Sequence, residues 1–301
     1  MLHLLVLFLL VLIIDRICGS ILRKLYYSQI AGTNYETTYA MDSTRADILI
    51  FGSSRAIFHY VPEIFEDSLK MSCFNCGRHG SFAMYNYAVF KAITERYTPK
   101  TVILDITPEE FNFNNSSYER LSPLLPYYQN HPEIRDIVEL RGPYEKIKLL
   151  SAIYPYNSLL FEIGTGNLEL KGSRKIVING YMPQYNLIPD TILRFEEDYK
   201  GKAAIDSNSI KVVTKMAQIC NQRHIRFIIV TSPFYAKFGE CYTVELLEKF
   251  AKENKTEYVS FINDPGFIKN PQYFQDQNHL NNNGATLFSQ MLASKLKENS
   301  L

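Results

Sequence analysis

The stretch ILIFGSSRAIFHY, residues 48–60, passes from a short apolar run through a glycine, two serines and an arginine into residues with helical spacing. Its first four residues, Ile48 to Phe51, predict a strand that is buried on both faces of a sheet. A serine at the point where such a strand gives way to a helix has two roles open to it. Either Ser53 or Ser54 caps the helix, or Ser54 stands at the ligand-binding edge of the sheet as a nucleophile.

Four further apolar runs have the length of strands, and segments with helical spacing lie between them. The strand candidates are Met71 to Phe74, Thr101 to Ile106, Ile225 to Thr231 and Tyr258 to Ile262, and the helical segments lie around residues 82–97, 210–220 and 287–292. Strands that alternate with helices predict an α/β fold with a parallel sheet covered on both faces. Ligands bind such sheets beyond the carboxyl ends of the strands, so the residues after each strand are the site candidates.

The interval from about Phe111 to Lys202 interrupts this alternation and is rich in tyrosine, proline and asparagine. It predicts an insertion of about residues 111–202 within the α/β domain. Its tyrosines either line a groove for a sugar or lipid, or pack the insertion onto the domain, which is the commoner use of such residues.

The composition is that of a folded globular protein, with 46% hydrophobic and 21% charged residues among 301. A formal net charge of +1 and the lack of a long basic run give no electrostatic footprint for nucleic acid. We therefore expect no nucleic-acid partner.

The N-terminus departs from this average, because Leu2 to Ile14 is apolar except for His3. This run is shorter than the roughly 20 residues that span a bilayer, but it becomes long enough if the following Asp15–Arg16 pair lies near an interface. Residues 1–24 therefore predict an uncleaved membrane anchor in preference to a removed signal peptide.

A linker of residues 25–45 and then the α/β domain follow this segment in the predicted organisation. The basic residues Arg16, Arg23 and Lys24 come after the apolar run, and the positive-inside rule alone would place the domain in the cytoplasm. The sequence leaves the topology open.

The five cysteines carry no metal-binding pattern. They are Cys18, Cys73, Cys76, Cys220 and Cys241, with one C-x-x-C pair and no second pair or histidine pair at zinc-ligand spacing. We expect small buried hydrophobic residues at Cys73 and Cys76, or a disulfide if the domain is exported. No metal and no organic cofactor is predicted.

Near the C-terminus, the stretch YFQDQNHLNNNGA places Asp276 and His279 three residues apart, before a helix that starts near Gly284. A serine is a weak nucleophile until a base takes its proton, and a carboxylate that orients the histidine stabilises the imidazolium that forms. Asp276 and His279 are therefore candidates for the orienting acid and the base that would activate Ser54. The alternative is that the aspartate caps a turn and the histidine only packs.

Three ordered blocks of this sequence resemble those of the SGNH/GDSL hydrolase superfamily. The first is Phe51-Gly52-Ser53-Ser54, the second is Asn75-Cys76-Gly77-Arg78-His79-Gly80-Ser81, and the third is the Asp276-x-x-His279 pair. The resemblance implies a three-layer, flavodoxin-like fold with strand order 2-1-3-4-5 over about residues 46–297. It also implies Ser54, Asp276 and His279 as catalytic residues.

The second block implies Gly80 as an oxyanion donor, with the backbone N–H of Ser54 as its partner and Asn75 as a substrate-binding residue. A glycine suits this role because its N–H can approach the developing charge without a Cβ in the way. Alternatively, the glycines serve only the turn between strand and helix.

The family's usual block-three asparagine is missing, since Asp105-Ile106-Thr107-Pro108 follows the third strand candidate. Three replacements remain open: Thr107, Asn112 from the following loop, or backbone donors alone. Losing one such donor costs about 100-fold or more in rate. Asp105 is expected to accept hydrogen bonds as a structural carboxylate.

Arg55 either binds an anionic or carbonyl group of the substrate or pairs with a structural acid, and the salt bridge is the favoured reading. His59 and His79 are expected to pack or face solvent, because only His279 has a carboxylate at the family spacing.

The resemblance implies a membrane-anchored serine enzyme that acts on acylated cell-envelope carbohydrate or another ester, as an esterase or an O-acyltransferase. It implies an extracytoplasmic catalytic domain, with export after signal cleavage as the less favoured alternative. The rival hypothesis is a non-catalytic envelope protein whose degenerate domain binds a glycan or a partner.

Overall fold

The protein, seen in a computed structural model, is built on a sheet of five parallel strands. The structure describes residues 1–168, 177–189, 191–192, 195–197, 204–239 and 242–298. The strands of the sheet are β1 (Ile48–Phe51), β2 (Cys73–Asn75), β3 (Thr101–Asp105), β5 (Arg226–Thr231) and β7 (Glu257–Ser260). Their order across the sheet is β2-β1-β3-β5-β7. Counted along the chain this is 2-1-3-4-5, so the predicted fold class is confirmed.

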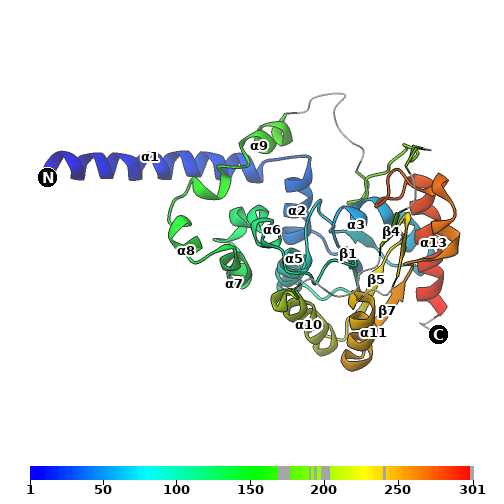
Figure 1. Ribbon diagram of the computed structural model, residues 1–301. Helices are drawn as coiled ribbons and strands as arrows, with labels where there is room; N and C mark the ends of the chain where they lie inside the picture. Colours follow the sequence, from blue (N-terminus) through cyan, green and yellow to red (C-terminus); the bar gives the residue numbers. More distant parts are fainter. Residues whose placement is uncertain (169–176, 190, 193–194, 198–203, 240–241, 299–301) are drawn as a thin grey trace.

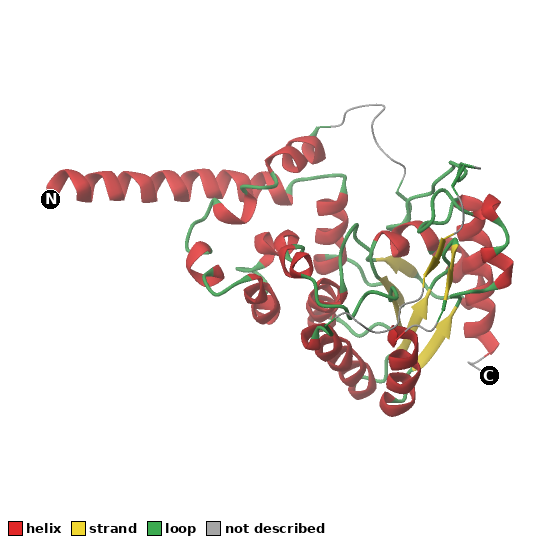
Figure 2. Ribbon diagram, viewed as in Figure 1, coloured by secondary structure: helices red, strands yellow, loops and turns green. Residues whose placement is uncertain are grey.

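Both faces of this sheet are covered by helices, which gives three layers (Figures 1 and 2). Because side chains alternate along a strand, Leu49 and Phe51 of β1 enter one core cluster, and Ile48 and Ile50 enter the other. The first cluster is enclosed by α2 (Thr33–Asp42), α5 (Ala83–Arg96), α10 (Ser207–Gln222) and α11 (Tyr242–Asn254); the second is enclosed by α3 (Ser54–His59), α4 (Pro62–Leu69), α12 (Pro265–Ile268), η5 (Pro271–Tyr273) and α13 (Asn282–Glu298). All four residues of β1 are fully buried, which explains their continuous apolar run.

Strand positions were predicted to within a few residues. The largest shift at a strand start is at β2, which begins at Cys73 instead of Met71. Lys70 ends α4 in the left-handed conformation, with a φ of 57°, and the chain then uses Met71 and Ser72 to turn back to the sheet.

The described part of the predicted insertion consists mainly of short helical turns. They are α6 (Asn115–Glu119), η1 (Ser122–Tyr127), η2 (Pro132–Ile134), α7 (Arg135–Val138), η3 (Glu139–Arg141), α8 (Glu145–Lys148), η4 (Tyr154–Tyr156) and α9 (Leu160–Asn167), and the short strand β4 (Phe195–Glu197) pairs with β6 (Ala236–Phe238). Residues 169–176, 190, 193–194 and 198–202 of the insertion lie outside the described residues. The buried tyrosines Tyr127 and Tyr156 pack beside Tyr26, whose hydroxyl donates to that of Tyr127 at 3.0 Å. These two tyrosines therefore pack the insertion onto the rest of the protein.

The N-terminal helix α1 (Leu2–Tyr27) projects from the α/β body in Figure 1. By length and apolar composition it can cross a membrane, and a signal sequence near an N-terminus has the same properties. The helix runs past residue 24. The stretch predicted as a linker, residues 25–45, contains the last turn of α1 and all of α2, whose buried Ala40 and Met41 join the core.

The chain makes a sterically crowded turn at Gly52, between β1 and the two serines that begin α3. Gly52 has a φ of +153°, and a Cβ at this position would lie 2.9 Å from the Cβ atoms of both Ala56 and Asp105. The turn is thus squeezed between α3 and the end of β3.

Replacing Gly52 by alanine is expected to lower the free energy of unfolding by about 2 kcal/mol. The added methyl group would clash with α3 and β3, and alanine would also be strained at this φ. Gly142→Ala is the matched control, since a Cβ at Gly142 meets no atom within 4 Å. Urea unfolding of the detergent-solubilised protein, followed by circular dichroism, measures both. Equal free energies of unfolding for the two variants would show that the turn accommodates a methyl group at residue 52 without strain.

Candidate active site

A pocket of about 720 Å³ opens at the edge of the sheet where the parallel strands end. Its lining comes from the segments after β1, β2, β3 and β5 and from the loop before α13. This is the edge at which ligands bind in sheets of this topology. Among the lining residues are the predicted Ser54, Arg55, Gly80, Thr107 and His279.

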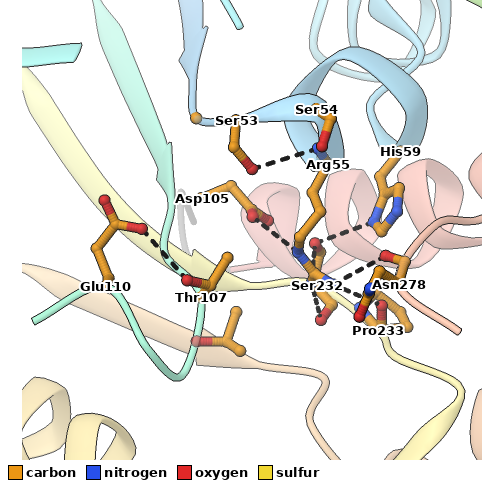
Figure 3. A network of polar contacts seen from close by, with 12 residues as sticks. Ser53, Ser54, Arg55, His59, Asp105, Thr107, Glu110, Ser232, Pro233 and Asn278 are labelled. Atoms are coloured by element: carbon orange, nitrogen blue, oxygen red, sulfur yellow. Dashed lines mark hydrogen bonds and ion pairs between the residues drawn. The ribbon is translucent and has the colours of Figure 1, made fainter. Parts of the chain in front are cut away.

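The two serines after β1 have different positions. Ser53 is the N-cap of α3, and its hydroxyl accepts a long hydrogen bond of 3.5 Å from the backbone N–H of Arg55 (Figure 3). Ser54 is the first residue of α3, and its Oγ lies 2.8 Å from Nε2 of His279. The capping position is thus filled by Ser53, and the hydroxyl of Ser54 is left to contact the histidine.

Asp276 and His279 are joined within one turn of chain. The Nδ1 atom of His279 lies 3.0 Å from each oxygen of the Asp276 carboxylate, and Oδ1 of Asp276 also accepts from the backbone N–H groups of Asn278 and His279. The carboxylate can only accept, so Nδ1 carries the proton and Nε2 is the acceptor for the Ser54 hydroxyl. Burial opposes the charge of Asp276, but its bonds with His279 and the two N–H groups outweigh burial and hold the carboxyl pKa below its usual value.

Arg55 is buried beside this chain of hydrogen bonds, and protein atoms accept from all of its N–H groups. Nε donates to Asp105 at 3.3 Å, and Nη1 donates to the carbonyls of Pro233 and Asn278 at 3.2 Å each. Nη2 donates to the carbonyl of Ser232 and, at 2.6 Å, to its hydroxyl (Figure 3). A guanidinium has five N–H donors, so these five acceptors leave none for a substrate. The geometry favours the salt bridge over the substrate-binding role for Arg55.

His59, one helical turn after Arg55, holds the other side of the same loop. Its Nε2 accepts the backbone N–H of Leu280 at 3.0 Å, so Nδ1 carries the proton that is donated to the Ser232 hydroxyl at 3.0 Å. Burial, together with the charge of Arg55 and the nearby His279, lowers the pKa of His59 well below its usual value and keeps the ring neutral. Arg55 and His59 therefore bond the peptide groups directly before and after His279.

Asp105 is the last residue of β3. The resemblance to the SGNH superfamily led us to expect an asparagine in the segment that follows this strand. Oδ1 of Asp105 accepts from Arg55, and its Oδ2 accepts from the hydroxyl of Tyr60 at 2.6 Å. Both Arg55 and Asp105 are almost completely buried, which is tolerable only because each polar group is paired. Asp105 acts as the predicted structural carboxylate toward side-chain donors.

The segment directly after β3 brings no side-chain amide to the pocket, because Ile106, Thr107 and Pro108 follow the strand. Gly80 lines the pocket with a φ of +66°, and within the described chain neither its N–H nor that of Ser54 has a hydrogen-bond acceptor. Of the two side-chain replacements, Thr107 lines the pocket but its hydroxyl donates to Glu110 at 3.3 Å. Asn112 forms an isolated β-bridge with Ile205 and does not line the pocket.

Asn75, the other predicted substrate-binding residue, faces the interior. Its side-chain NH₂ donates to the carbonyls of Ala56 and Tyr60, and its Oδ1 accepts the N–H of Gly77. The side chain ties β2 to α3, and Asn75 is not among the residues that line the pocket.

Ser232 and Glu110 are two polar residues of the pocket region that were not singled out from the sequence. Ser232 follows β5 directly, so the rule that sites lie beyond strand ends could have found it. Glu110 lines the pocket, and burial raises its pKa to about 7, while the N–H of Ala83 and the hydroxyl of Thr107 act in the opposite direction. A glutamate in the turn after a strand carries no distinctive sequence pattern.

Comparisons with known proteins add little to this geometry. No protein-family model matches the chain, and no curated protein matches it by sequence. Among solved structures, the chain is similar to a Bacteroides fragilis protein described as a "putative acylhydrolase", with 12% sequence identity and a TM-score of 0.42. The similarity covers 84% of this chain and 86% of that one. So remote a likeness carries no argument about activity, and the fold class rests on the strand order described above.

The neutral state of His59 predicts a dependence of stability on pH. Because the pKa of His59 is lower in the folded chain than in the unfolded chain, the unfolded state binds more protons below a pH of about 6.5, and acidification favours unfolding by about 1.4 kcal/mol per pH unit. Glu110, with its pKa raised to about 7, has the opposite effect over the same range.

The difference between wild type and His59→Gln isolates the histidine, since glutamine cannot titrate. We expect the free energy of unfolding of wild type, relative to the variant, to fall as pH is lowered from about 6.5 to 5. Denaturant titrations at several pH values measure it. Parallel pH profiles would mean that His59 is protonated in the fold and that the bond from Leu280 is absent.

Proposed function

We propose that this chain is a serine-dependent ester hydrolase or acyltransferase of the SGNH type, with Ser54 as nucleophile, His279 as acid and base, and Asp276 as orienter. The observation that carries the proposal is the unbroken chain of hydrogen bonds from the Ser54 hydroxyl through His279 to Asp276, at the wall of a pocket. A hydroxyl becomes a useful nucleophile when a base lies within hydrogen-bond reach and a third group orients that base. A module that only binds a ligand needs no such arrangement.

In the proposed reaction, Nε2 of His279 takes the Ser54 proton while Oγ forms a bond to the carbonyl carbon of the ester. The carbonyl π electrons move to oxygen, and the backbone N–H groups of Gly80 and Ser54 are proposed to stabilise that oxyanion. As the oxyanion collapses, the bond from carbon to the alcohol oxygen breaks, and the imidazolium gives its proton to the leaving alcohol. The acyl group then remains on Ser54.

Deacylation repeats these steps with a second nucleophile, which His279 deprotonates. Water as that nucleophile gives a carboxylic acid and makes the protein an esterase. A sugar hydroxyl gives a new ester and makes it an acyltransferase. Both outcomes use the same residues.

We propose acylated carbohydrate of the cell envelope as the substrate class, with the domain on the outer side of the membrane. The aromatic rings of Phe82, Phe234 and Phe238 line the pocket beside polar groups, a combination that suits a sugar ring with its apolar face and hydroxyls. The basic residues after the apolar run argue against this topology. However, Arg16 and Arg23 bond to Leu150 and Asn130, so they have a structural role apart from topology.

A fluorophosphonate probe is expected to label the folded protein at Ser54, because the His279 base activates this hydroxyl. Labelling should vanish in Ser54→Ala and persist in Ser53→Ala, since Ser53 makes only a weak cap. Mass spectrometry of the modified peptide and gel fluorescence provide the readout. A folded protein that takes no label would favour the rival function of a glycan- or partner-binding protein.

Asp276→Asn is expected to lower kcat for an aryl acetate by about 10³-fold or more with little change in KM, because an amide can donate to Nδ1 and reverse the histidine tautomer. Asp264→Asn makes the same chemical change where a carboxylate only caps α12, and should retain activity. Steady-state kinetics of both variants test the pair. Similar activity of the two would remove Asp276 from the mechanism.

A further inference from the structure

The second half of α1 is docked on the insertion. The Asp15 carboxylate accepts from the Ser151 hydroxyl at 2.5 Å and from the backbone N–H groups of Ala152 and Ile153. One turn further on, Gly19 approaches Ala152 so closely that a Cβ on the glycine would lie 2.4 Å from the Ala152 Cβ. Cleavage near Gly19 would remove these contacts, so the helix fits a permanent part of the protein.

The apolar part of α1 must be as long as the hydrocarbon core of a membrane if the helix is to span it. The exposed apolar run Leu2–Ile14 is about 20 Å long, which is too short for a hydrocarbon core of about 30 Å. On the face turned away from the insertion, Ile17, Ile21 and Leu25 continue the apolar stripe, and each is more than 40% exposed. With them the stripe is about 36 Å long and can span a bilayer.

A bilayer that covers this stripe also reaches the insertion, because the insertion is packed against the same part of the helix. The carbonyl of Leu150 accepts from Arg16, and Asn167 of α9 donates to the carbonyl of Leu25. In Figure 1, α8 and α9 lie on opposite sides of α1, between its exposed end and the sheet.

The insertion exposes large apolar side chains at α8 and α9, beside α1. They are Ile147 and Leu150 at α8, with 64% and 68% of their surface exposed, and Leu160 and Phe161 at α9, with 55% and 80%. Soluble surfaces rarely expose several large apolar side chains together, and these four lie on or next to the two helices that flank α1 in Figure 1. We call Ile147, Leu150, Leu160 and Phe161 the apolar rim.

Charges beside the apolar rim suit the headgroup region. A cavity of about 390 Å³ between α1 and the insertion is lined by Arg16, Ser20 and Arg23, and the exposed Lys24 lies next to it in the chain. Arg16 lies nearer to the hydrocarbon, and the Asp15 carboxylate 3.8 Å away offsets its charge. Arg23 and Lys24, further along α1, lie at the depth where basic side chains attract the phosphates of anionic lipids.

We propose that the insertion is a membrane-interface module, in which the apolar rim enters the boundary between headgroups and acyl chains of an anionic bilayer while α1 spans it. The insertion thereby fixes the height and orientation of the α/β domain over the lipid surface. This proposal does not depend on the catalytic function of Ser54.

The chain contains no tryptophan, so single tryptophans report position without background. The full-length variants Leu150→Trp and Phe161→Trp are reconstituted in vesicles of phosphatidylcholine and phosphatidylglycerol that contain phosphatidylcholine brominated near the headgroup end of its acyl chains. Each tryptophan is expected to lose about half of its emission, because bromine quenches only on close approach and the rim lies at that depth.

Leu7→Trp is the inserted control and should be quenched more by lipids brominated near the chain ends. Tyr185→Trp is the solvent control, since Tyr185 is 73% exposed and lies three residues before Ile188, which bonds Phe274 and packs in the core cluster on the α13 side of the sheet. Quenching at Leu150 and Phe161 no stronger than at Tyr185, or an unquenched Leu7→Trp, would overturn the proposal. Fluorophosphonate labelling of the same variants reports on Ser54 separately.

Discussion

The buried guanidinium of Arg55 is the constraint on which the candidate site depends. It lies in α3 beside the candidate nucleophile and bonds the carbonyl of Asn278, next to the candidate base, so one side chain ties together two segments that are 223 residues apart. Asp105 balances the charge of the guanidinium, and the Phe234 ring stacks on it, with its centroid 3.5 Å from Cζ of Arg55. Removing one partner of such a pair costs about 3–5 kcal/mol, because the other charge is left buried and uncompensated.

His59 completes this arrangement from the same short helix. Arg55 and His59 lie four residues apart, and so they point from one face of α3 toward the loop before α13. The peptide groups before and after His279 are both held, which fixes the backbone from which the ring reaches Ser54 and Asp276. A misplacement of about 1 Å can cost 100-fold in rate, so this support of the backbone contributes to the position of the candidate base.

The sequence could predict those features that require particular residue types at particular positions. The apolar run of β1, the alternation of strands and helices, and the Asp276-x-x-His279 spacing each restrict which residues can occur. The salt bridge of Arg55 to an acid was predicted, but its other hydrogen bonds could not be, because most of their acceptors are backbone carbonyls, which every residue has. Asn75 misled for a related reason: an amide next to a strand suits a substrate and a backbone turn equally well, and here it bonds the backbone.

The most direct test of this account is the crystal structure of the protein after reaction with a fluorophosphonate. We expect phosphorus bonded to Oγ of Ser54, a phosphonyl oxygen within hydrogen-bond distance of the N–H groups of Gly80 and Ser54, and Arg55 still bonded to the carbonyl of Asn278. Phosphorus on another side chain, or a phosphonyl oxygen turned away from Gly80, would contradict it.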